Sequence, residues 1–167
     1  MTMGLHKSII SKLGGYTDSN PEILTIYSPF EEVSDDSSDL LSNCLPLGSK
    51  IGDVIVTEYK ENSLLSYIFS VEQSEHRDDL FSFSLLLDKS VNPDIYKPVV
   101  EKILSSLRQN NLLTEEVLRT HQNLIFESLN QEKDLEIENT IIELSALFKK
   151  MNKETEKKKP KVKGSFF

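Results

Sequence analysis

Two segments in which apolar and polar residues alternate, separated by a short polar stretch, constrain this chain more than any other feature. Their alternating apolar positions are Leu65, Tyr67, Phe69 and Val71, then Phe81, Phe83, Leu85 and Leu87. A period of two is typical of β-strands that pack one face against a core. The two segments therefore predict a pair of strands joined by a turn over residues 75–79.

The chain before this pair predicts two more strands of the same sheet. Residues 21–27 alternate, and Pro29 ends them because proline cannot continue a central ladder. Residues 51–59 place Val54 and Val56 on one face and lead through the polar turn 61–63 into the next strand. The middle of the chain is therefore expected to be a three-stranded meander.

Helices are expected after the meander. Asn92 and Pro93 offer an N-cap and a first helical residue, and Thr114 offers a second N-cap. The apolar-face positions that follow recur every three or four residues, at Ile95, Val99, Ile103, Leu104 and Leu107, and then at Val117, Leu118, His121, Leu124, Ile125 and Leu129. This spacing is typical of amphipathic helices.

The two ends of the chain carry weaker patterns. Residues 5–13 fit a short amphipathic helix that a glycine pair stops, and the acidic stretch 31–38 fits a solvated loop or a helix start. A final helix is expected over residues 131–152. Its narrow apolar seam runs through Ile137, Ile141, Leu144, Phe148 and Met151. The seam fits packing on the chain's own domain and docking of a partner helix equally well.

Together these elements predict an α+β fold with an antiparallel sheet of about five strands and flanking helices. We expect an N-terminal segment over residues 1–19 and one domain over residues 20–130. The C-terminal helix over 131–152 should follow, and then a flexible basic tail over 153–167, which buries too little apolar surface to fold.

Charge is divided unevenly along the chain. Residues 149–163 contain eight lysines and two glutamates, a charge of +6, which leaves −14 for the rest of a chain whose net charge is −8. An acidic body lacks the cationic face that phosphate contacts require, so nucleic acid is not expected as a partner.

The residues that could carry chemistry of their own are few. Cys44 is the single cysteine, so no intramolecular disulfide or cysteine-based zinc site can form. His6, His76 and His121 include no pair at metal-ligand spacing, and neither a nucleophile elbow nor a phosphate-binding glycine loop occurs. We therefore expect no cofactor. With no long apolar stretch and no secretory segment, the chain is expected in the cytoplasm.

Arg77 is the strongest candidate for a functional residue, because a turn between two strands offers its side chain to a partner. The alternative is a solvated turn residue paired with Asp78 or Asp79. The stretch Ser70–Phe83 resembles the strand, loop and strand of the nitrogen permease regulator-like longin domains, and folliculin-type longin domains share the theme. Asn20–Tyr27 and Tyr96–Leu129 resemble the first segment and the paired helices of that family more loosely.

The resemblance implies a longin-like fold with the α-β-α layering of profilin and roadblock proteins. It further implies a regulator that binds a small Ras-like GTPase and activates it with Arg77 as an arginine finger. GTP and Mg²⁺ would then belong to the partner. A second longin or roadblock-type subunit would complete a homodimer or heterodimer.

A different class of function, a non-catalytic membrane-trafficking adaptor, stays open. In that interpretation the lysine-rich tail binds an anionic membrane as a peripheral anchor. Its candidate contacts are Lys157, Lys158, Lys159, Lys161, Lys163, Phe166 and Phe167. Residues 3–8 also match the myristoylation pattern, which would lipidate Gly4 if translation began at Met3.

Overall fold

The structure is a computed structural model that describes residues 4–15, 20–28, 37–72 and 77–158. The elements, in chain order, are β1 Leu5–Leu13, β2 Glu22–Tyr27, α1 Ser37–Cys44, β3 Val54–Tyr59, β4 Asn62–Val71, β5 Asp79–Leu87, α2 Tyr96–Gln109, α3 Glu115–Thr120, α4 Gln122–Gln131, β6 Leu135–Ile137, β7 Thr140–Ile142 and α5 Ser145–Lys158. A short 3-10 turn, Pro93–Ile95, leads into α2.

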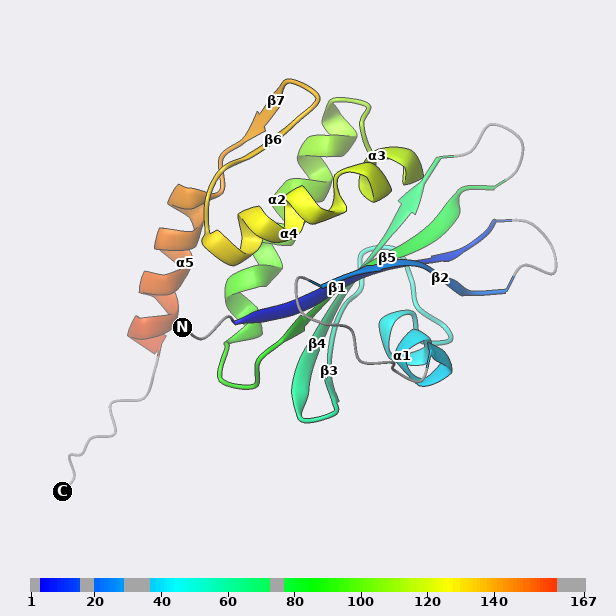
Figure 1. The fold of residues 1–167 in the computed structure, drawn as a ribbon, viewed down its shortest axis with the longest axis horizontal. Coiled ribbons are helices and arrows are strands. Elements are labelled where there is room, and N and C mark those ends of the chain that lie inside the picture. Colours follow the sequence, from blue (N-terminus) through cyan, green and yellow to red (C-terminus); the bar gives the residue numbers. More distant parts are fainter. Residues whose placement is uncertain (1–3, 16–19, 29–36, 73–76, 159–167) are drawn as a thin grey trace.

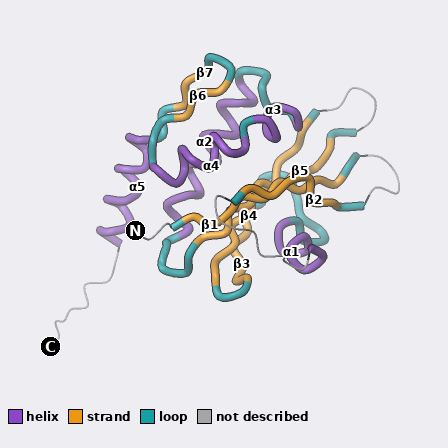
Figure 2. The backbone as a smooth tube through the Cα atoms, viewed as in Figure 1, coloured by secondary structure: helices purple, strands orange, loops and turns teal. Residues whose placement is uncertain are grey.

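The first five strands form one sheet in the order β2-β1-β5-β4-β3, and every neighbouring pair is antiparallel. Helices α2, α3, α4 and α5 lie on one side of the sheet, and α1 lies on the other (Figures 1 and 2). The predicted α+β class, with a five-stranded antiparallel sheet and flanking helices, is therefore confirmed.

The alternating pattern of the sequence explains how β4 and β5, in the sheet interior, pack against α2. In the β4–β5 ladder Tyr67 lies opposite Phe83, and Phe69 lies opposite Phe81, with the latter two rings 5.8 Å apart. The apolar positions of both strands thus share the face that α2 covers, and they form the main core with α2, α4 and α5. Both strands are confirmed as the alternation predicted them.

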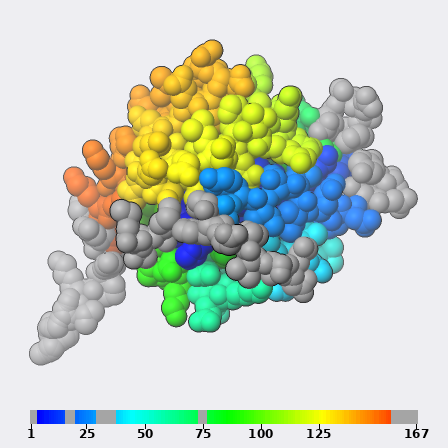
Figure 3. Space-filling model, viewed as in Figure 1, coloured from blue at the N-terminus to red at the C-terminus, as the bar shows by residue number. Residues whose placement is uncertain are grey.

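Both predicted N-caps are present, although Asn92 caps the 3-10 turn that leads into α2, which itself begins at Tyr96, and Thr114 caps α3. The Asn92 side chain accepts a hydrogen bond from the Asp94 amide, and the Thr114 hydroxyl accepts one from the Val117 amide. Helix α4 packs directly beside β1 and β2, as the space-filling view shows (Figure 3). The Tyr27 and Phe126 rings meet there edge to face at 5.2 Å.

The N-terminal prediction is wrong, because residues 5–13 form strand β1 and not a short helix. β1 pairs with β2 on one side and β5 on the other, so it lies within the sheet. Ile9 packs beneath α1 and Ile10 packs in the main core. Because both faces of β1 are covered, its apolar residues do not alternate, and the spacing resembles that of a helix.

The prediction of one helix over residues 131–152 is also wrong in its first half. A hairpin, β6–β7, precedes α5, and its turn residues Glu138 and Asn139 have φ angles of 49° and 68°. α5 then continues to Lys158, beyond the predicted start of the flexible tail at residue 153.

The apolar seam mostly packs on the chain's own domain. Leu144 and Phe148 are fully buried, and the Phe148 ring lies 5.7 Å from that of Tyr96. Ile141, in contrast, points outward from β7 and is 65% exposed. Of the two interpretations of the seam, packing within the domain is therefore the one that the buried residues support. Over the described part of the chain, each helix is too short or too polar to cross a membrane.

Candidate functional site

Arg77 lies just before the first residue of β5, at the open end of the β4–β5 pair. The ladder closes with Val71 opposite Asp79, so β4 and β5 are neighbouring strands as predicted, but Asp79, which the prediction placed in the turn, is already the first residue of β5. Arg77 and Asp78 are exposed, whereas Asp79 is buried. Glu75 and His76, which belong to the same predicted turn, lie outside the described residues.

The end of β1 meets the Arg77 segment at Gly15. The Arg77 Nε donates a hydrogen bond to the Gly15 carbonyl at 3.3 Å. The Gly15 amide donates in turn to Asp79 Oδ1 at 2.9 Å. A Cβ atom at position 15 would lie 2.1 Å from the Arg77 carbonyl oxygen, so only glycine fits this approach.

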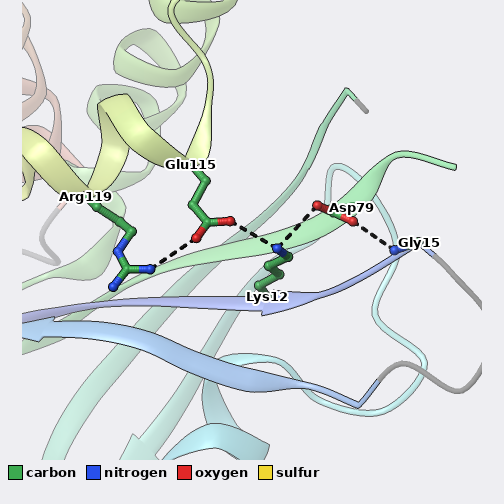
Figure 4. A network of polar contacts seen from close by, with 5 residues as sticks. All are labelled: Lys12, Gly15, Asp79, Glu115 and Arg119. Carbon is green, nitrogen blue, oxygen red and sulfur yellow. Dashed lines mark hydrogen bonds and ion pairs between the residues drawn. The ribbon is translucent and has the colours of Figure 1, made fainter. Parts of the chain in front are cut away.

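A chain of opposite charges continues from this contact across the sheet to α3 (Figure 4). The Lys12 ammonium lies 3.6 Å from Asp79 Oδ2 and 3.0 Å from Glu115 Oε1. Glu115 also pairs with Arg119 at 3.1 Å. The network therefore joins β5, β1 and α3, and it begins at Asp79, two residues after Arg77.

The pKa of Lys12 reflects this network. Its partial burial acts to lower the pKa, but the hydrogen bond to Glu115 and the charges of Glu115 and Asp79 outweigh burial and raise the pKa above its usual value. Lys12 therefore stays charged at neutral pH and neutralises carboxylates that would otherwise repel one another.

Sequence reasoning singled out Arg77 but missed the residues that hold its segment. The glycine pair at positions 14 and 15 was interpreted as a helix stop, although Gly15 in fact makes room for the Arg77 backbone. The ion pairs of Lys12 join residues that are far apart in sequence, for example Glu115. No local pattern could have identified them.

Other candidate chemical groups lie elsewhere in the fold. Cys44 ends α1 and is fully buried, and burial raises the pKa of its thiol to about 11, so it stays protonated at neutral pH. His121 Nε2 lies 3.1 Å from Glu138 Oε2 at the hairpin. Within the described ranges, no three acidic, histidine or cysteine side chains converge as metal ligands would.

Two surface hollows lie away from Arg77. One, of about 640 Å³, lies between α4 and the β6–β7 hairpin and includes His121, Asp134 and Glu138 in its lining. The other, of about 430 Å³, is lined by polar residues that include Asn130, Glu132 and Asn152. Arg77 lines neither of them.

The predicted membrane contacts fall at the end of the described chain. The backbones of Lys157 and Lys158 form the last turn of α5. The remaining predicted contacts, Lys159, Lys161, Lys163, Phe166 and Phe167, lie outside the described residues.

Comparison with known proteins assigns no family. No protein-family model matches this sequence, and no curated protein matches it either.

Proposed function

We propose that this chain is a longin-like regulator that binds a small Ras-like GTPase in the cytoplasm and stimulates GTP hydrolysis with Arg77. The observation that carries the proposal is the exposed Arg77 side chain at the junction of two strand ends, where its Nε bonds to the Gly15 carbonyl and the Gly15 amide bonds to the nearby Asp79 carboxylate.

The order of elements supports the longin-like part of the proposal. After β1 and β2 come α1, the meander β3–β4–β5 and the helices α2 and α3. Apart from the additional strand β1 at its start, this is the order of strand, helix, three-stranded meander and helices that a longin-like fold implies. Helices on both faces of the sheet are compatible with the expected α-β-α layering.

The chemistry of phosphoryl transfer supports the role of Arg77. Negative charge spreads over the transferred phosphoryl group in the transition state. A guanidinium inserted from a second protein stabilises this charge and raises the rate of hydrolysis roughly 10³- to 10⁵-fold. Such a finger works best when its backbone is already ordered, because less conformational freedom is lost on docking. Gly15 and the Asp79–Lys12 pair give Arg77 such a support.

The test is single-turnover GTP hydrolysis by Ras-like GTPases of the same organism, with and without the full chain. We expect Arg77→Ala to remove the stimulation while leaving the affinity for the GTPase nearly unchanged. Arg77→Lys should also fail, because lysine keeps the charge but lacks the planar fork of donors. Lys133→Ala removes an exposed cation between α4 and β6, outside the network of Lys12 and Asp79, and should keep the stimulation.

Binding without stimulation would overturn the finger and favour the second candidate, a trafficking adaptor. The observation behind that candidate is the exposed lysine row on α5, at Lys149, Lys150 and Lys153, which leads toward the lysine-rich tail. The adaptor predicts that truncation after Met151 abolishes sedimentation with anionic vesicles. No binding to any GTPase would overturn the GTPase proposal.

We propose further that the chain works as a dimer with a longin or roadblock-type subunit.

A further inference from the structure

The hollow of about 430 Å³, called the polar hollow below, lies where three segments that are distant in sequence meet. These segments are the end of α4, one side of α5 and the chain just before α2 (Figure 1). Its described lining includes Val91, Tyr96, Asn130, Glu132, Asn152 and Thr155. Ligand sites in proteins are commonly hollows of roughly 300 to 1,000 Å³. The polar hollow is therefore large enough for a small organic molecule.

The charge of the polar hollow has one sign. Glu132 is exposed, and it is the only charged residue among the described residues of the lining. No described lysine, arginine or histidine pairs with its carboxylate; instead Asn152 Nδ2 donates a hydrogen bond to Glu132 Oε1 at 3.3 Å. Glu132 also caps the C-terminus of α4, where the helix dipole is negative. The polar hollow therefore favours a cation over an anion.

The Tyr96 hydroxyl is a second, independent sign of a ligand site. Tyr96 is only 6% exposed, yet among the described residues none forms a hydrogen bond with its hydroxyl. Buried tyrosine hydroxyls usually find such a partner. Burial, and then the Glu132 charge, raise the pKa of this hydroxyl, so Glu132 acts on it from the same hollow that both residues line. The hydroxyl is therefore free to bond to a ligand there.

The neutral side chains around Glu132 offer oxygen acceptors. Asn152 donates through its amide nitrogen, which leaves its Oδ1 free to accept. Thr155 Oγ1 donates to carbonyls of its own helix, so its lone pairs remain. The Asn130 side chain bonds to none of the described residues. A primary ammonium has three donors and no acceptor, so it suits a carboxylate surrounded by such oxygens.

A metal ion suits the same groups less well. Ca²⁺ takes about six to eight oxygen ligands, typically including several carboxylates, whereas Glu132 is the one carboxylate in the described lining. Val91 and Ile95 add apolar surface to the polar hollow, which an alkyl chain can contact and a metal ion cannot use. The lining thus combines one negative charge, several oxygen acceptors and an apolar side.

We propose that the polar hollow binds a small organic cation through a primary ammonium group, with Glu132 as its counter-ion. The Tyr96 hydroxyl and the Asn152 amide oxygen accept further hydrogen bonds from the ammonium, and Val91 and Ile95 contact its alkyl chain. The inference goes beyond the proposed function. Arg77 does not line the polar hollow, so either proposal can fail alone.

The test is a titration of the ¹⁵N-labelled full chain with pentylammonium chloride at pH 7 and constant ionic strength, read from amide chemical shifts. Concentrations up to about 20 mM are needed, because so small a ligand binds weakly. Saturable shifts should concentrate at residues 90–96, 130–132 and 152–155. Pentan-1-ol has the same alkyl chain without the charge, and it should bind about tenfold more weakly or worse.

Two variants test the proposed contacts. Glu132→Gln keeps the size of the side chain but removes its charge, so it should weaken pentylammonium binding about tenfold and leave pentan-1-ol binding unchanged. Tyr96→Phe removes only the hydroxyl and should weaken pentylammonium binding several-fold. Glu136 is an exposed carboxylate that lines the other hollow, so Glu136→Gln is the matched control and should bind like the wild type. The amide spectrum of each variant shows whether it is folded.

Four results would each overturn the proposal. The first is a lack of saturable shifts with pentylammonium, and the second is equal affinity for pentylammonium and pentan-1-ol. The third is pentylammonium binding that Glu132→Gln or Tyr96→Phe leaves unchanged. The fourth is binding that Glu136→Gln abolishes, which would place the cation in the hollow beside the β6–β7 hairpin.

Discussion

At residue 15 the backbone of one strand end touches the backbone of another. The Gly15 amide and carbonyl both bond to the Arg77–Asp79 segment, which leaves no room for a side chain. The glycine pair is visible in the sequence, but its partner lies 62 residues away. The sequence could therefore predict Arg77 as a turn residue, yet not that Gly15 holds it.

We expect Gly15→Ala to shift the Arg77 segment, because the added Cβ would lie 2.1 Å from the Arg77 carbonyl oxygen. Forcing extra atoms into a packed contact lowers the free energy of unfolding by about 1 to 3 kcal/mol. Urea denaturation measures this loss, and hydrogen exchange should show faster exchange of the Asp79 and Leu80 amides. Unchanged stability and exchange would mean that the two strand ends do not touch in solution.

At the scale of elements, the largest difference from the sequence-based prediction is the β6–β7 hairpin. Its turn, Glu138–Asn139, adopts positive φ at both residues, as a tight two-residue hairpin turn requires. The strongest turn signals contain glycine, and this one does not. Because Ile137, Leu144 and Phe148 also recur at helical spacing, the helix pattern was the stronger local signal.

Asp134 joins the hairpin to α5, and its charge should matter for stability. Asp134 Oδ1 accepts hydrogen bonds from the Leu144 and Ser145 amides, both at 2.9 Å. The Ser145 and Leu144 donors, with a smaller effect of the Lys102 charge, lower the pKa of Asp134 below its ordinary value of 3.8. A lowered folded-state pKa adds stability above the unfolded-state pKa, and the gain is lost as pH falls through the folded-state pKa.

We therefore expect Asp134→Asn to lower the urea midpoint at pH 7, and the difference from the wild type to shrink as pH falls below about 3.8. Glu136 is an exposed carboxylate on the same hairpin, so Glu136→Gln is the matched control. This variant should leave the urea midpoint unchanged both at pH 7 and at low pH. A difference between Asp134→Asn and the wild type that stays constant with pH would contradict the role of the Asp134 charge.

At the scale of the whole molecule, α5 belongs to the main core, on the α2 side of the sheet. Phe148 is fully buried against Tyr96, and both residues belong to the cluster that contains the β4 and β5 side chains. Burial, and then the Glu132 charge, raise the pKa of Tyr96 to about 12. The C-terminal helix is thus part of the fold.

Phe148→Ala should accordingly destabilise the entire protein. Removing a buried phenylalanine costs about 3 to 5 kcal/mol through lost burial and the cavity left behind. The loss should appear as one cooperative transition in thermal and urea denaturation. Lys149 follows Phe148 in the chain and is exposed, so Lys149→Ala should keep the free energy of unfolding within about 0.5 kcal/mol of the wild-type value. Separate melting of α5 ahead of the sheet would show that α5 is an independent appendage.

The sequence alone determined the elements whose pattern is strong along the chain itself. β4 and β5 are buried on both faces, but large apolar residues recur at every second position on the α2 side and several serines lie between them, so their alternation is local information. The starts of the helices after the meander depend on caps within three residues, such as Thr114. Arg77 was also visible as an exposed turn residue. In each case the physical cause lies within a few residues of its effect.

Only the tertiary structure decided the rest. β1 is covered on both faces by segments distant in sequence, so its own pattern could not distinguish strand from helix. The Lys12–Glu115 pair joins residues that are 103 positions apart. The apolar side chains near the β3 edge are exposed because α2 packs over β4 and leaves a hollow beside Ile51. These features depend on which surfaces meet after folding, and no local pattern in the sequence specifies that.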